Sequence, residues 1–455
     1  MKKTLSIALA VAAMFSFYGC KTPNQPDPVN EESRIVRLRD VGKEIPNPTI
    51  DLNNCIPEGS EATLKSVRYV EGKPIYYMDY TAKVDWESLL TQPGDEHFDV
   101  FCLPQVSYKV SQALFRDLEL QEPIEGPYGS CSGFICKNKN GELLNCRNFD
   151  GDEGEMVVVF NHNVKPGEHK SVMMTDLSWA QMFAGDVSYK GNKVLLNGKE
   201  MNALLRQPIS TVDGMNDAGL VIAGYQLPDF QDQDSSIVDP FPSPTPRPYG
   251  SDQTTGKPQI GFMAVFYLAL TTCETVDDVI KMLQQHDYVA LLRQLNMHWC
   301  VSDATGKWRT LEYWPANDEQ QAVGDLKKGQ MDLLYDYDEE ARSKSAFLGN
   351  HNIAYEYMSM ENYYYHPKPS STFYTDYWQR EFGGVFRAHN MMSHYSLVMD
   401  EEEALDVLQY GSYGIEVPGH VTNWSCVYNS KQRTMLFTVR NQTDKAFFID
   451  LKTDL

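Results

Sequence analysis

One stretch constrains the fold of this chain more than any other, because it predicts a β-hairpin with reactive side chains at its open end. It reads SCSGFICKNKNGELLNCRNFD and holds two short apolar runs separated by Asn140-Gly141. Asn-Gly between two such runs is a strong hairpin signal, because Gly supplies a positive φ and Asn tolerates one. The hairpin would fold Arg147 and Asp150 back toward Cys131.

This geometry is compatible with a nucleophilic Cys131 that becomes the first residue of a processed chain. A thiol has a reference pKa of about 8.5, so it needs a base or a nearby cation to attack at neutral pH. A free α-amino group, with a reference pKa of about 7.7 to 8.0, would be the base. Arg147 would favour the thiolate, and Asp150 would orient the ammonium. The same residues also fit a structural hairpin with a buried cysteine.

The N-terminus is typical of an exported bacterial protein. Residues 1–19 carry two lysines, an apolar run too short to cross a membrane, and Gly19. Cys20 follows and predicts lipid attachment after cleavage, although two bulky aromatic residues before Gly19 leave ordinary signal-peptide cleavage open. Residues 20–45 are predicted to be a flexible tether, since the segment opens with prolines among Asn, Asp and Glu. We expect a cell-envelope lipoprotein that touches the membrane only through its lipid.

Composition excludes some partners and leaves others open. The net charge of −22, from 62 acidic and 40 basic residues, disfavours nucleic-acid binding, which needs a basic surface. The 455 residues, 42% of them apolar, can form one large domain or two ordinary ones. The nine cysteines and ten histidines show no metal-ligand spacing. A cross-strand contact between Cys136 and Cys146 is conceivable.

Between the tether and the hairpin, residues 46–130 form an upstream region with mixed signals. Strands are expected within 67–80 and 84–90, a helix over 106–118, and a loop over 123–129, where Pro and Gly cluster. If Cys131 needs a free amine, the bond between residues 130 and 131 must be cut. The upstream region would then be a propeptide or a separate subunit.

After the hairpin the chain alternates between strand and helix patterns. Gly214 and Gly219 are expected to bracket a tight turn that Asn216 braces beside the active site, and a proline-rich surface loop is expected over 229–258. Thr275 is a candidate helix cap. The predicted helices cover 261–272 and 276–286, and the predicted strands cover 155–160, 171–174, 193–196, 220–225, the part of 297–307 before its Gly turn, 309–314, 421–428, 435–439 and 446–451.

Cys131, followed after a hairpin by Arg147-Asn148-x-Asp150, resembles the start of the mature chain in the choloylglycine hydrolase family of N-terminal-nucleophile (Ntn) hydrolases. That family includes bile salt hydrolases and penicillin V acylases, with acid ceramidase and N-acylethanolamine acid amidase as more distant relatives. Four further stretches follow in the family's order: DGMNDAGL at 213–220, MHWCVSDATGK at 297–307, FLGN at 347–350 and VTNWSCVY at 421–428.

The resemblance implies an α+β fold over residues 131–455, a four-layer αββα sandwich of two antiparallel sheets between helix layers. It also implies further catalytic residues. Asn350 would donate to the oxyanion, although it also fits a loop residue that caps a helix. Gln226 stands where many bile salt hydrolases carry an Asn, which puts the second oxyanion donor and bile salt specificity in doubt. Arg380 is the candidate for the family's late catalytic arginine.

The implied reaction is hydrolysis of a linear, non-peptide amide in a small N-acyl substrate, without a cofactor. A conjugated bile salt, an N-acyl amino acid or amine, and a penicillin V-like compound all fit. The long upstream region is similar to ceramidase-like relatives, which cut themselves and keep the upstream piece. Relatives are often tetramers, so a homo-oligomer is possible. Two alternatives remain: a catalytically silent ligand-binding lipoprotein, and an acyltransferase on the same fold.

Overall fold

The computed structural model describes residues 34–45, 57–87, 131–151, 154–177, 201, 204–226, 258–289, 297–313, 331–334, 347–349, 394, 396, 398–412, 421–440 and 442–455. Residues 1–35 and 36–455 form two separate units, and the fold below is that of the second. Across the described ranges, none of the helices combines the length and apolar character that a membrane span requires. The predictions for residues 88–90, 106–118, 193–196 and 229–257 lie outside these ranges.

The hairpin predicted from Asn140-Gly141 is confirmed. It consists of β5 (Ser132–Lys137) and β6 (Leu143–Gly151), paired antiparallel so that Gly133 faces Arg147 across the ladder. Gly141 has φ 76°, which favours glycine. The side chain of Asn138 closes the turn, because its Oδ1 accepts from the backbone nitrogens of Asn140 at 2.9 Å and Glu142 at 3.0 Å.

This hairpin lies inside a seven-stranded sheet with the order β1-β19-β18-β17-β6-β5-β16. Its other strands are β1 (Ile35–Arg37), β16 (Phe347–Gly349), β17 (Val421–Asn429), β18 (Thr434–Val439) and β19 (Ala446–Asp450). The three strands predicted near the C-terminus are therefore present. They reach the hairpin through β17, which pairs antiparallel with β6.

A second sheet has ten strands in the order β15-β14-β13-β10-β9-β8-β7-β4-β3-β2. Its strands are β2 (Gly42–Glu44), β3 (Arg68–Val70), β4 (Ile75–Tyr80), β7 (Met156–Asn161), β8 (Ser171–Asp176), β9 (Thr211–Asn216), β10 (Val221–Gln226), β13 (Met297–Ser302), β14 (Trp308–Tyr313) and β15 (Met331–Leu334). A separate parallel pair joins β11 (Gln259–Gly261) and β12 (Asp287–Val289).

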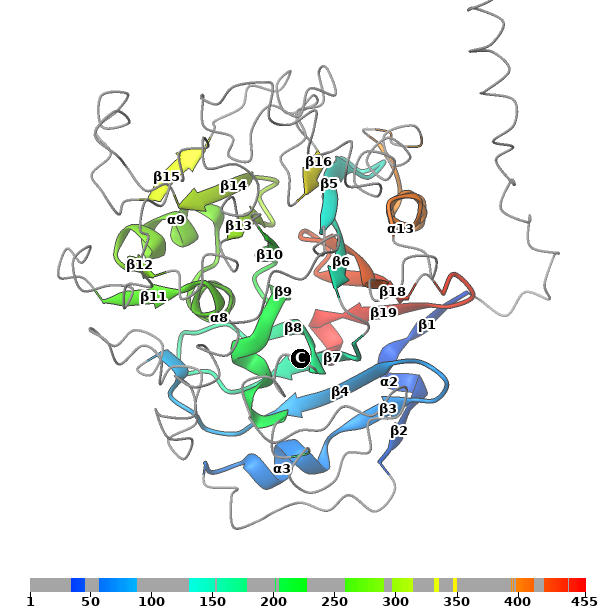
Figure 1. Ribbon diagram of the computed structural model, residues 1–455, viewed down its shortest axis with the longest axis horizontal. Coiled ribbons are helices and arrows are strands. Elements are labelled where there is room, and N and C mark those ends of the chain that lie inside the picture. The colour runs from blue at the N-terminus through cyan, green and yellow to red at the C-terminus, as the bar shows by residue number, and fades with distance from the viewer. Residues whose placement is uncertain are drawn as a thin grey trace, which may run out of the picture. The chain divides into compact units, whose positions relative to one another are not determined.

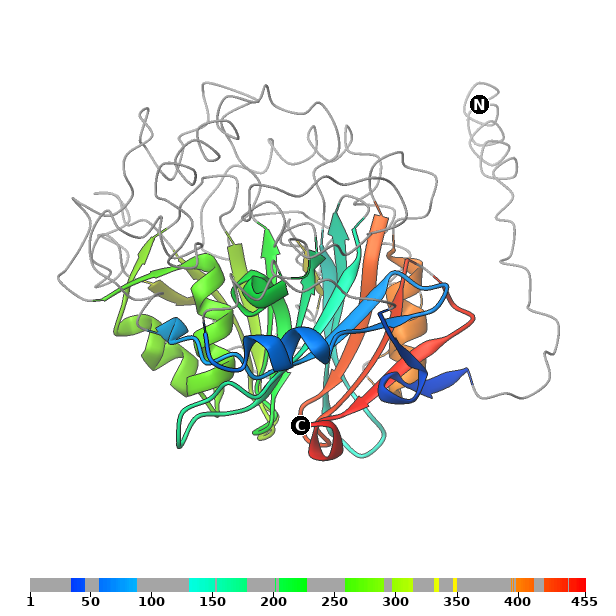
Figure 2. The same cartoon turned by 90° about the horizontal axis from the view of Figure 1, so that it is seen from below.

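Helices lie on the outer faces of both sheets, as Figures 1 and 2 show. The ten-stranded sheet packs against α8 (Phe262–Thr272), α9 (Val276–Gln284), α3 (Ser60–Lys65) and the 3-10 helix η3 (Leu204–Ser210) through one apolar core. The seven-stranded sheet is covered by α13 (Glu401–Tyr410), and a second apolar core fills the space between the sheets. The αββα sandwich of the α+β class is confirmed.

The predicted cap of α9 is present and explains where this helix begins. Thr275 accepts a hydrogen bond from the backbone nitrogen of Asp278, whose carboxylate in turn accepts from the backbone of Thr275, forming a capping box. The preceding helix α8 is apolar on nearly every side and is buried from Ala264 to Leu270. It therefore serves as a core helix between the sheet and the outer layer.

The expectation of purely antiparallel sheets is wrong for the ten-stranded sheet. Its strand β4 pairs in parallel with β7, from Ile75 opposite Met156 to Tyr80 opposite Asn161. A parallel pair needs a long crossover connection instead of a tight turn. Such a connection exists because β4 belongs to the upstream region and β7 follows the hairpin.

The prediction of a flexible tether over residues 20–45 is wrong for residues 35–44. These residues form β1, α2 (Leu38–Val41) and β2. Leu38 is fully buried in the core between the sheets, and Val36 and Val41 pack against that core. Apolar residues interspersed with charged ones give this short segment a buried face, which a solvated tether does not have.

The turn in the DGMNDAGL stretch is shorter than expected. Gly214 lies inside β9, where an added Cβ would collide with the Val172 carbonyl oxygen, and only Gly219, with φ 91°, occupies the turn. Asn216 braces this turn by accepting from the backbone nitrogens of residues 218 and 220. Its amide donates to α8 at Leu270, on the face of β9 opposite to Asp213, so it does not lie beside Cys131.

Candidate active site

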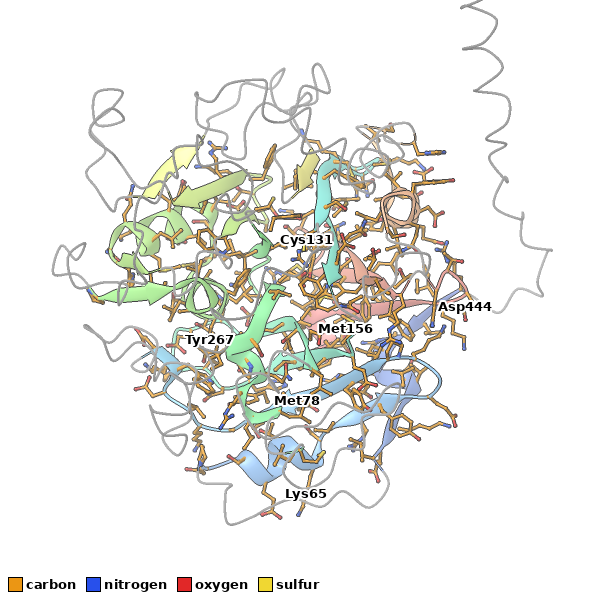
Figure 3. The ribbon with its side chains drawn as sticks, in the orientation of Figure 1. Lys65, Met78, Cys131, Met156, Tyr267 and Asp444 are labelled. Carbon is orange, nitrogen blue, oxygen red and sulfur yellow. The ribbon has the colours of Figure 1, made fainter. Side chains whose placement is uncertain are left out.

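Cys131 lies immediately before β5, and its side chain faces the space between the two sheets (Figure 3). The residue is 5% exposed. Its Sγ is 3.6 Å from Nη2 of Arg147 and 4.0 Å from the backbone oxygen of Asp150. The hairpin thus brings both downstream residues to the cysteine, as the sequence predicted.

The guanidinium of Arg147 is fully buried and links the two sheets. Its Nη1 lies 2.5 Å from Oδ2 of Asp213 on β9, and its Nη2 donates to the backbone oxygen of Gly224 on β10 at 2.5 Å. Its Cζ is 5.0 Å from the ring centroid of Phe149 and 5.4 Å from that of Tyr225. Charge pairing and aromatic faces together give the cation a defined position.

Gly133 allows the close approach between the sheets beside the cysteine. A Cβ at this position would overlap the backbone oxygen of Cys146 and the hydroxyl of Tyr225. Because a backbone atom is one of the two obstacles, a larger residue would have to shift the strand itself. Glycine therefore lets the ring of Tyr225 lie near Arg147.

Asp213 is the member of this site that sequence reasoning missed. Besides the Arg147 ion pair, its Oδ1 accepts from the hydroxyl of Tyr428 at 2.7 Å and its Oδ2 accepts from Nε1 of Trp424 at 3.2 Å. Trp424 and Tyr428 both come from β17 of the opposite sheet. The carboxylate on β9 thus contacts three side chains of the seven-stranded sheet.

A signal for Asp213 was present in the sequence. Its neighbours Val212 and Met215 are apolar, and the strand predicted over 220–225 places this stretch beside a buried strand. A charged residue in such a strand requires a buried partner. The sequence pattern did not say which arginine that partner would be.

Burial dominates the protonation of the site. It raises the pKa of the Cys131 thiol above its ordinary value, while Arg147 lowers that pKa and the carboxylates of Asp150 and Asp213 raise it. Burial raises the pKa of Asp213 as well, against the lowering effect of Arg147. Burial alone would lower the pKa of Arg147, but the Asp213 carboxylate raises it above its ordinary value. The net effect favours the protonated form of this thiol.

The carboxylate of Asp150 has a different partner from the one expected. Its Oδ1 accepts from Oγ1 of Thr422 at 2.5 Å, across the β6–β17 ladder. Its backbone oxygen contacts Sγ of Cys131. The predicted role of Asp150 in orienting an ammonium stays a prediction.

The remaining predicted site residues fall largely outside the described part of the chain. Gln226 is placed through its backbone only, as the last residue of β10, opposite Met297. The strand β16 ends at Gly349, opposite Ser132. Asn350, Arg380 and Cys20 lie outside the described residues, and their roles stay predictions. Within the described ranges, no group of three His, Cys, Asp or Glu side chains is arranged to hold a metal ion.

The fold and the site together define a class. Cys131 lies at the start of a central strand, beside a paired arginine and between the sheets of an αββα sandwich, the fold of the Ntn hydrolases. Residues 131–317 match the model of the linear amide C–N hydrolases, choloylglycine hydrolase family. The chain thus carries a domain of this family and is a linear amide C–N hydrolase.

Solved structures of two enzymes resemble the chain. Penicillin V acylase from Agrobacterium tumefaciens is 16% identical with a TM-score of 0.36, and the match covers 71% of this chain and 87% of that one. A variant of conjugated bile acid hydrolase from Clostridium perfringens is 13% identical with a TM-score of 0.40, covering 71% and 94%. No curated protein matches the sequence. The family assignment therefore rests on the match over residues 131–317.

Proposed function

We propose that this protein is a cysteine Ntn amidohydrolase that cleaves the linear amide bond of a small N-acyl substrate after cutting its own chain before Cys131. The observation that supports this most is the 3.6 Å approach of the Arg147 guanidinium to Sγ of Cys131 in a buried site. A cation favours the charged state of a thiol that burial otherwise keeps neutral.

The cut would use the same thiol as the later reaction. Sγ of Cys131 adds to the carbonyl carbon of residue 130, and the peptide C–N bond breaks as the nitrogen of Cys131 takes a proton. Water then hydrolyses the resulting thioester and frees both the thiol and an α-amino group. The site would thereby gain a base next to the buried thiol.

In turnover, the α-amino nitrogen of Cys131 accepts the thiol proton as Sγ adds to the substrate carbonyl carbon. The C–N bond then breaks, and the ammonium returns the proton to the leaving amine. Water attacks the acyl-thioester with the same nitrogen as base, which releases a carboxylic acid and restores the thiol. Asn350, with Gln226 or a backbone nitrogen, would donate to the oxyanion, a contact worth about 3 to 4 kcal/mol.

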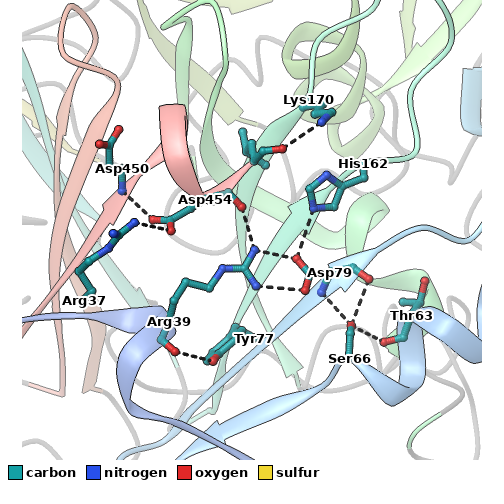
Figure 4. A network of polar contacts seen from close by, with 11 residues as sticks. Arg37, Arg39, Thr63, Ser66, Tyr77, Asp79, His162, Lys170, Asp450 and Asp454 are labelled. Carbon is teal, nitrogen blue, oxygen red and sulfur yellow. Dashed lines mark hydrogen bonds and ion pairs between the residues drawn. The ribbon is translucent and has the colours of Figure 1, made fainter.

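The upstream fragment would stay bound after the cut. Six residue pairs join β4 to β7, and removing β4 would leave the edge of a buried sheet without its partner. Arg39 reinforces this contact, because its guanidinium donates to the carboxylate of Asp79 at 2.7 and 3.1 Å and to the backbone oxygen of Asp454 at 2.8 Å (Figure 4). The product would thus be a complex of two fragments, which favours a subunit over a discarded propeptide.

N-terminal sequencing and intact mass of the wild type and Cys131→Ala test this proposal. The expected wild type gives two fragments that meet between residues 130 and 131 under denaturing conditions and elute as one species under native conditions. Cys131→Ala should stay full length and inactive. Uncut protein with full amidase activity would refute the mechanism, whereas uncut, inactive wild type would favour a ligand-binding protein.

The carboxylic acid released from each candidate substrate would identify the substrate class. A panel of conjugated bile salts, N-acyl amino acids, N-acylethanolamines and penicillin V, with the carboxylic acid measured as product, would rank the candidates. Adding a free amine as acceptor separates hydrolysis from acyl transfer, because a transferase would form a new amide at the expense of the acid.

We also propose that Cys20 carries the lipid that anchors the protein in the bacterial cell envelope. The support is the sequence of residues 1–20, in which an apolar run ends at Gly19-Cys20. Mass spectrometry of the N-terminal peptide from membranes, compared with Cys20→Ser, should show a diacylglycerol-sized addition in the wild type alone. An unmodified N-terminal peptide would contradict the lipid anchor at Cys20.

A further inference from the structure

Three hydrogen-bond donors surround the carboxylate of Asp213, which lies inside β9. Its two carboxylate oxygens receive hydrogen bonds from Arg147, Trp424 and Tyr428, at 2.5, 3.2 and 2.7 Å. All three donors point at the carboxylate and none of them is an acceptor in these contacts, which is the arrangement expected for the ionised form. The residue is fully buried, so water does not compete for these bonds.

The ion pair decides which nitrogen of Arg147 faces the sulfur. Asp213 takes Nη1, and the backbone oxygen of Gly224 and Sγ of Cys131 share Nη2. A guanidinium is planar with its donors in a fixed fork, so holding one nitrogen fixes the direction of the other. Asp213 also accepts hydrogen bonds from two β17 residues of the opposite sheet, Trp424 and Tyr428.

We propose that Asp213 is a positioning residue that holds the Arg147 guanidinium against Sγ of Cys131, a role that rests on the function proposed above. It acts through Arg147 and does not touch the substrate or the reacting atoms. The DGMNDAGL stretch thus supplies more than a turn. Its first residue, Asp213, orients the cation, while Asn216, in its middle, joins the sheet to α8.

Two effects of the Asp213 charge have opposite signs, which makes the proposal testable. As an anion near the sulfur, Asp213 opposes the thiolate directly. As the partner of Arg147, it keeps a cation next to the thiolate. Replacing it by a neutral residue would lower the thiol pKa if only the first effect existed. The same change would raise that pKa if Arg147 turned away from the sulfur.

The decisive variant is Asp213→Asn, which keeps the shape and removes the charge. Thiolate formation by Cys131 is followed by ultraviolet absorbance across a pH series, as the difference between each protein and its Cys131→Ala counterpart. We expect the Asp213→Asn titration to move to higher pH, and kcat for the amide substrate to fall about 10- to 100-fold with little change in KM, the size seen when an orienting partner is lost. A shift to lower pH, or no shift, would overturn the proposal.

A matched control separates positioning from stability. Tyr428→Phe removes a different hydrogen bond from the same carboxylate and leaves the ion pair in place. It should lower the melting temperature while the thiol titration stays close to that of the wild type. If Tyr428→Phe moves the titration as far as Asp213→Asn does, the carboxylate is only a structural tie between the sheets.

A double-variant comparison covers the possibility that Asp213→Asn folds poorly with an unpaired buried arginine. Arg147→Gln and Arg147→Gln/Asp213→Asn leave no arginine to position, and the second has no buried charge at either residue. If Asp213 acts through Arg147, adding Asp213→Asn to Arg147→Gln should no longer raise the pKa of Cys131, because contacting residues that act as a unit are non-additive. Only the direct charge effect then remains, which lowers that pKa. An upward shift in the double variant as large as that of Asp213→Asn alone would overturn the proposal.

The titration does not depend on turnover, so it separates this proposal from the function proposed above. A wild type that is uncut and inactive would contradict the amidohydrolase, yet the Asp213→Asn shift could still be measured in the intact chain. An active, cut enzyme without that shift would contradict only the role of Asp213.

Discussion

Two cysteines on the same hairpin have different surroundings because alternate residues of a strand face opposite sides. Cys131 is 5% exposed and lies on the side between the sheets, and Cys146 on β6 is fully buried. Arg147, the next residue after Cys146, faces the other sheet. Asn148 lies on the same side as Cys146 and donates to the backbone oxygen of Leu408 in α13. One-residue alternation therefore assigns one thiol to the interior site and the other to the helix layer.

The neighbours of the two thiols differ in charge. Cys131 has a guanidinium at 3.6 Å. Cys146 instead contacts the thiol of Cys136, the contact that the sequence made conceivable, and both cysteines are free. Burial first, and then Cys136 and Cys426, raise the pKa of Cys146 well above its ordinary value. Burial makes both thiols less reactive, and only at Cys131 does a cation act against it.

The largest expected difference is in activity. Cys131→Ala should abolish both the chain cut and amide hydrolysis, because the attacking atom is gone. Cys146→Ala should keep both and lose about 1 kcal/mol of stability, a typical effect of a core truncation. Product release and fragment masses measure the two outcomes. An inactive but folded Cys146→Ala protein would break the comparison.

Removing the cation should make the pKa values of the two thiols more similar. Arg147→Gln is expected to lower kcat by about 100-fold, similar to the loss of one electrostatic contact in a preorganised site. The pKa of Cys131 should rise in this variant, while that of Cys146, on the other side of β6, should stay unchanged. Thiolate absorbance checks this, measured as the difference between Arg147→Gln and the same variant carrying Cys131→Ala or Cys146→Ala. Circular dichroism must first show a folded variant, since removing one partner of a buried ion pair costs about 3 to 5 kcal/mol.

A smaller effect is expected from the glycine that separates the two environments. Gly133→Ala should destabilise the protein by about 1 to 3 kcal/mol, because the new Cβ meets the backbone oxygen of Cys146 and the hydroxyl of Tyr225. Activity should fall as well, since Tyr225 lies beside Arg147. Gly141→Ala is the matched control: it strains the turn at φ 76° but meets no other atom. Equal activity losses in the two variants would mean that the close approach at residue 133 is unimportant.

The smallest effect is a pH dependence of stability that differs between the two thiols. A folded pKa above the unfolded one means that the folded state keeps its proton longer. The stability is therefore fully present below the unfolded thiol pKa of about 8.5 and is lost as the pH rises toward the folded pKa, by about 1.4 kcal/mol per pH unit for each such thiol. Denaturant unfolding between neutral and alkaline pH should show this decline. Cys146→Ala should reduce this loss of stability over a wider pH range than Cys131→Ala does, because the pKa of Cys146 is raised further.

Local sequence signals predicted the elements that position the site. Asn140-Gly141 predicted the hairpin, Thr275 predicted the start of α9, and the apolar run after residue 155 predicted β7. These signals succeed because turn geometry, helix capping and strand burial each depend on a few neighbouring residues. The same reasoning failed for residues 35–44, because this short segment is stabilised by pairing with other strands, β1 with β19 near the C-terminus and β2 with β3.

By itself, the sequence determined which chemistry is available: a cysteine, an arginine and an aspartate that one hairpin brings together, in a pattern that identifies a linear amide C–N hydrolase. Only the tertiary structure decided that Asp213, from a strand of the other sheet, pairs with Arg147. It also decided that β4 lies in parallel beside β7. A pairing between sheets depends on how two layers pack, and no residue's own neighbours in the chain carry that information.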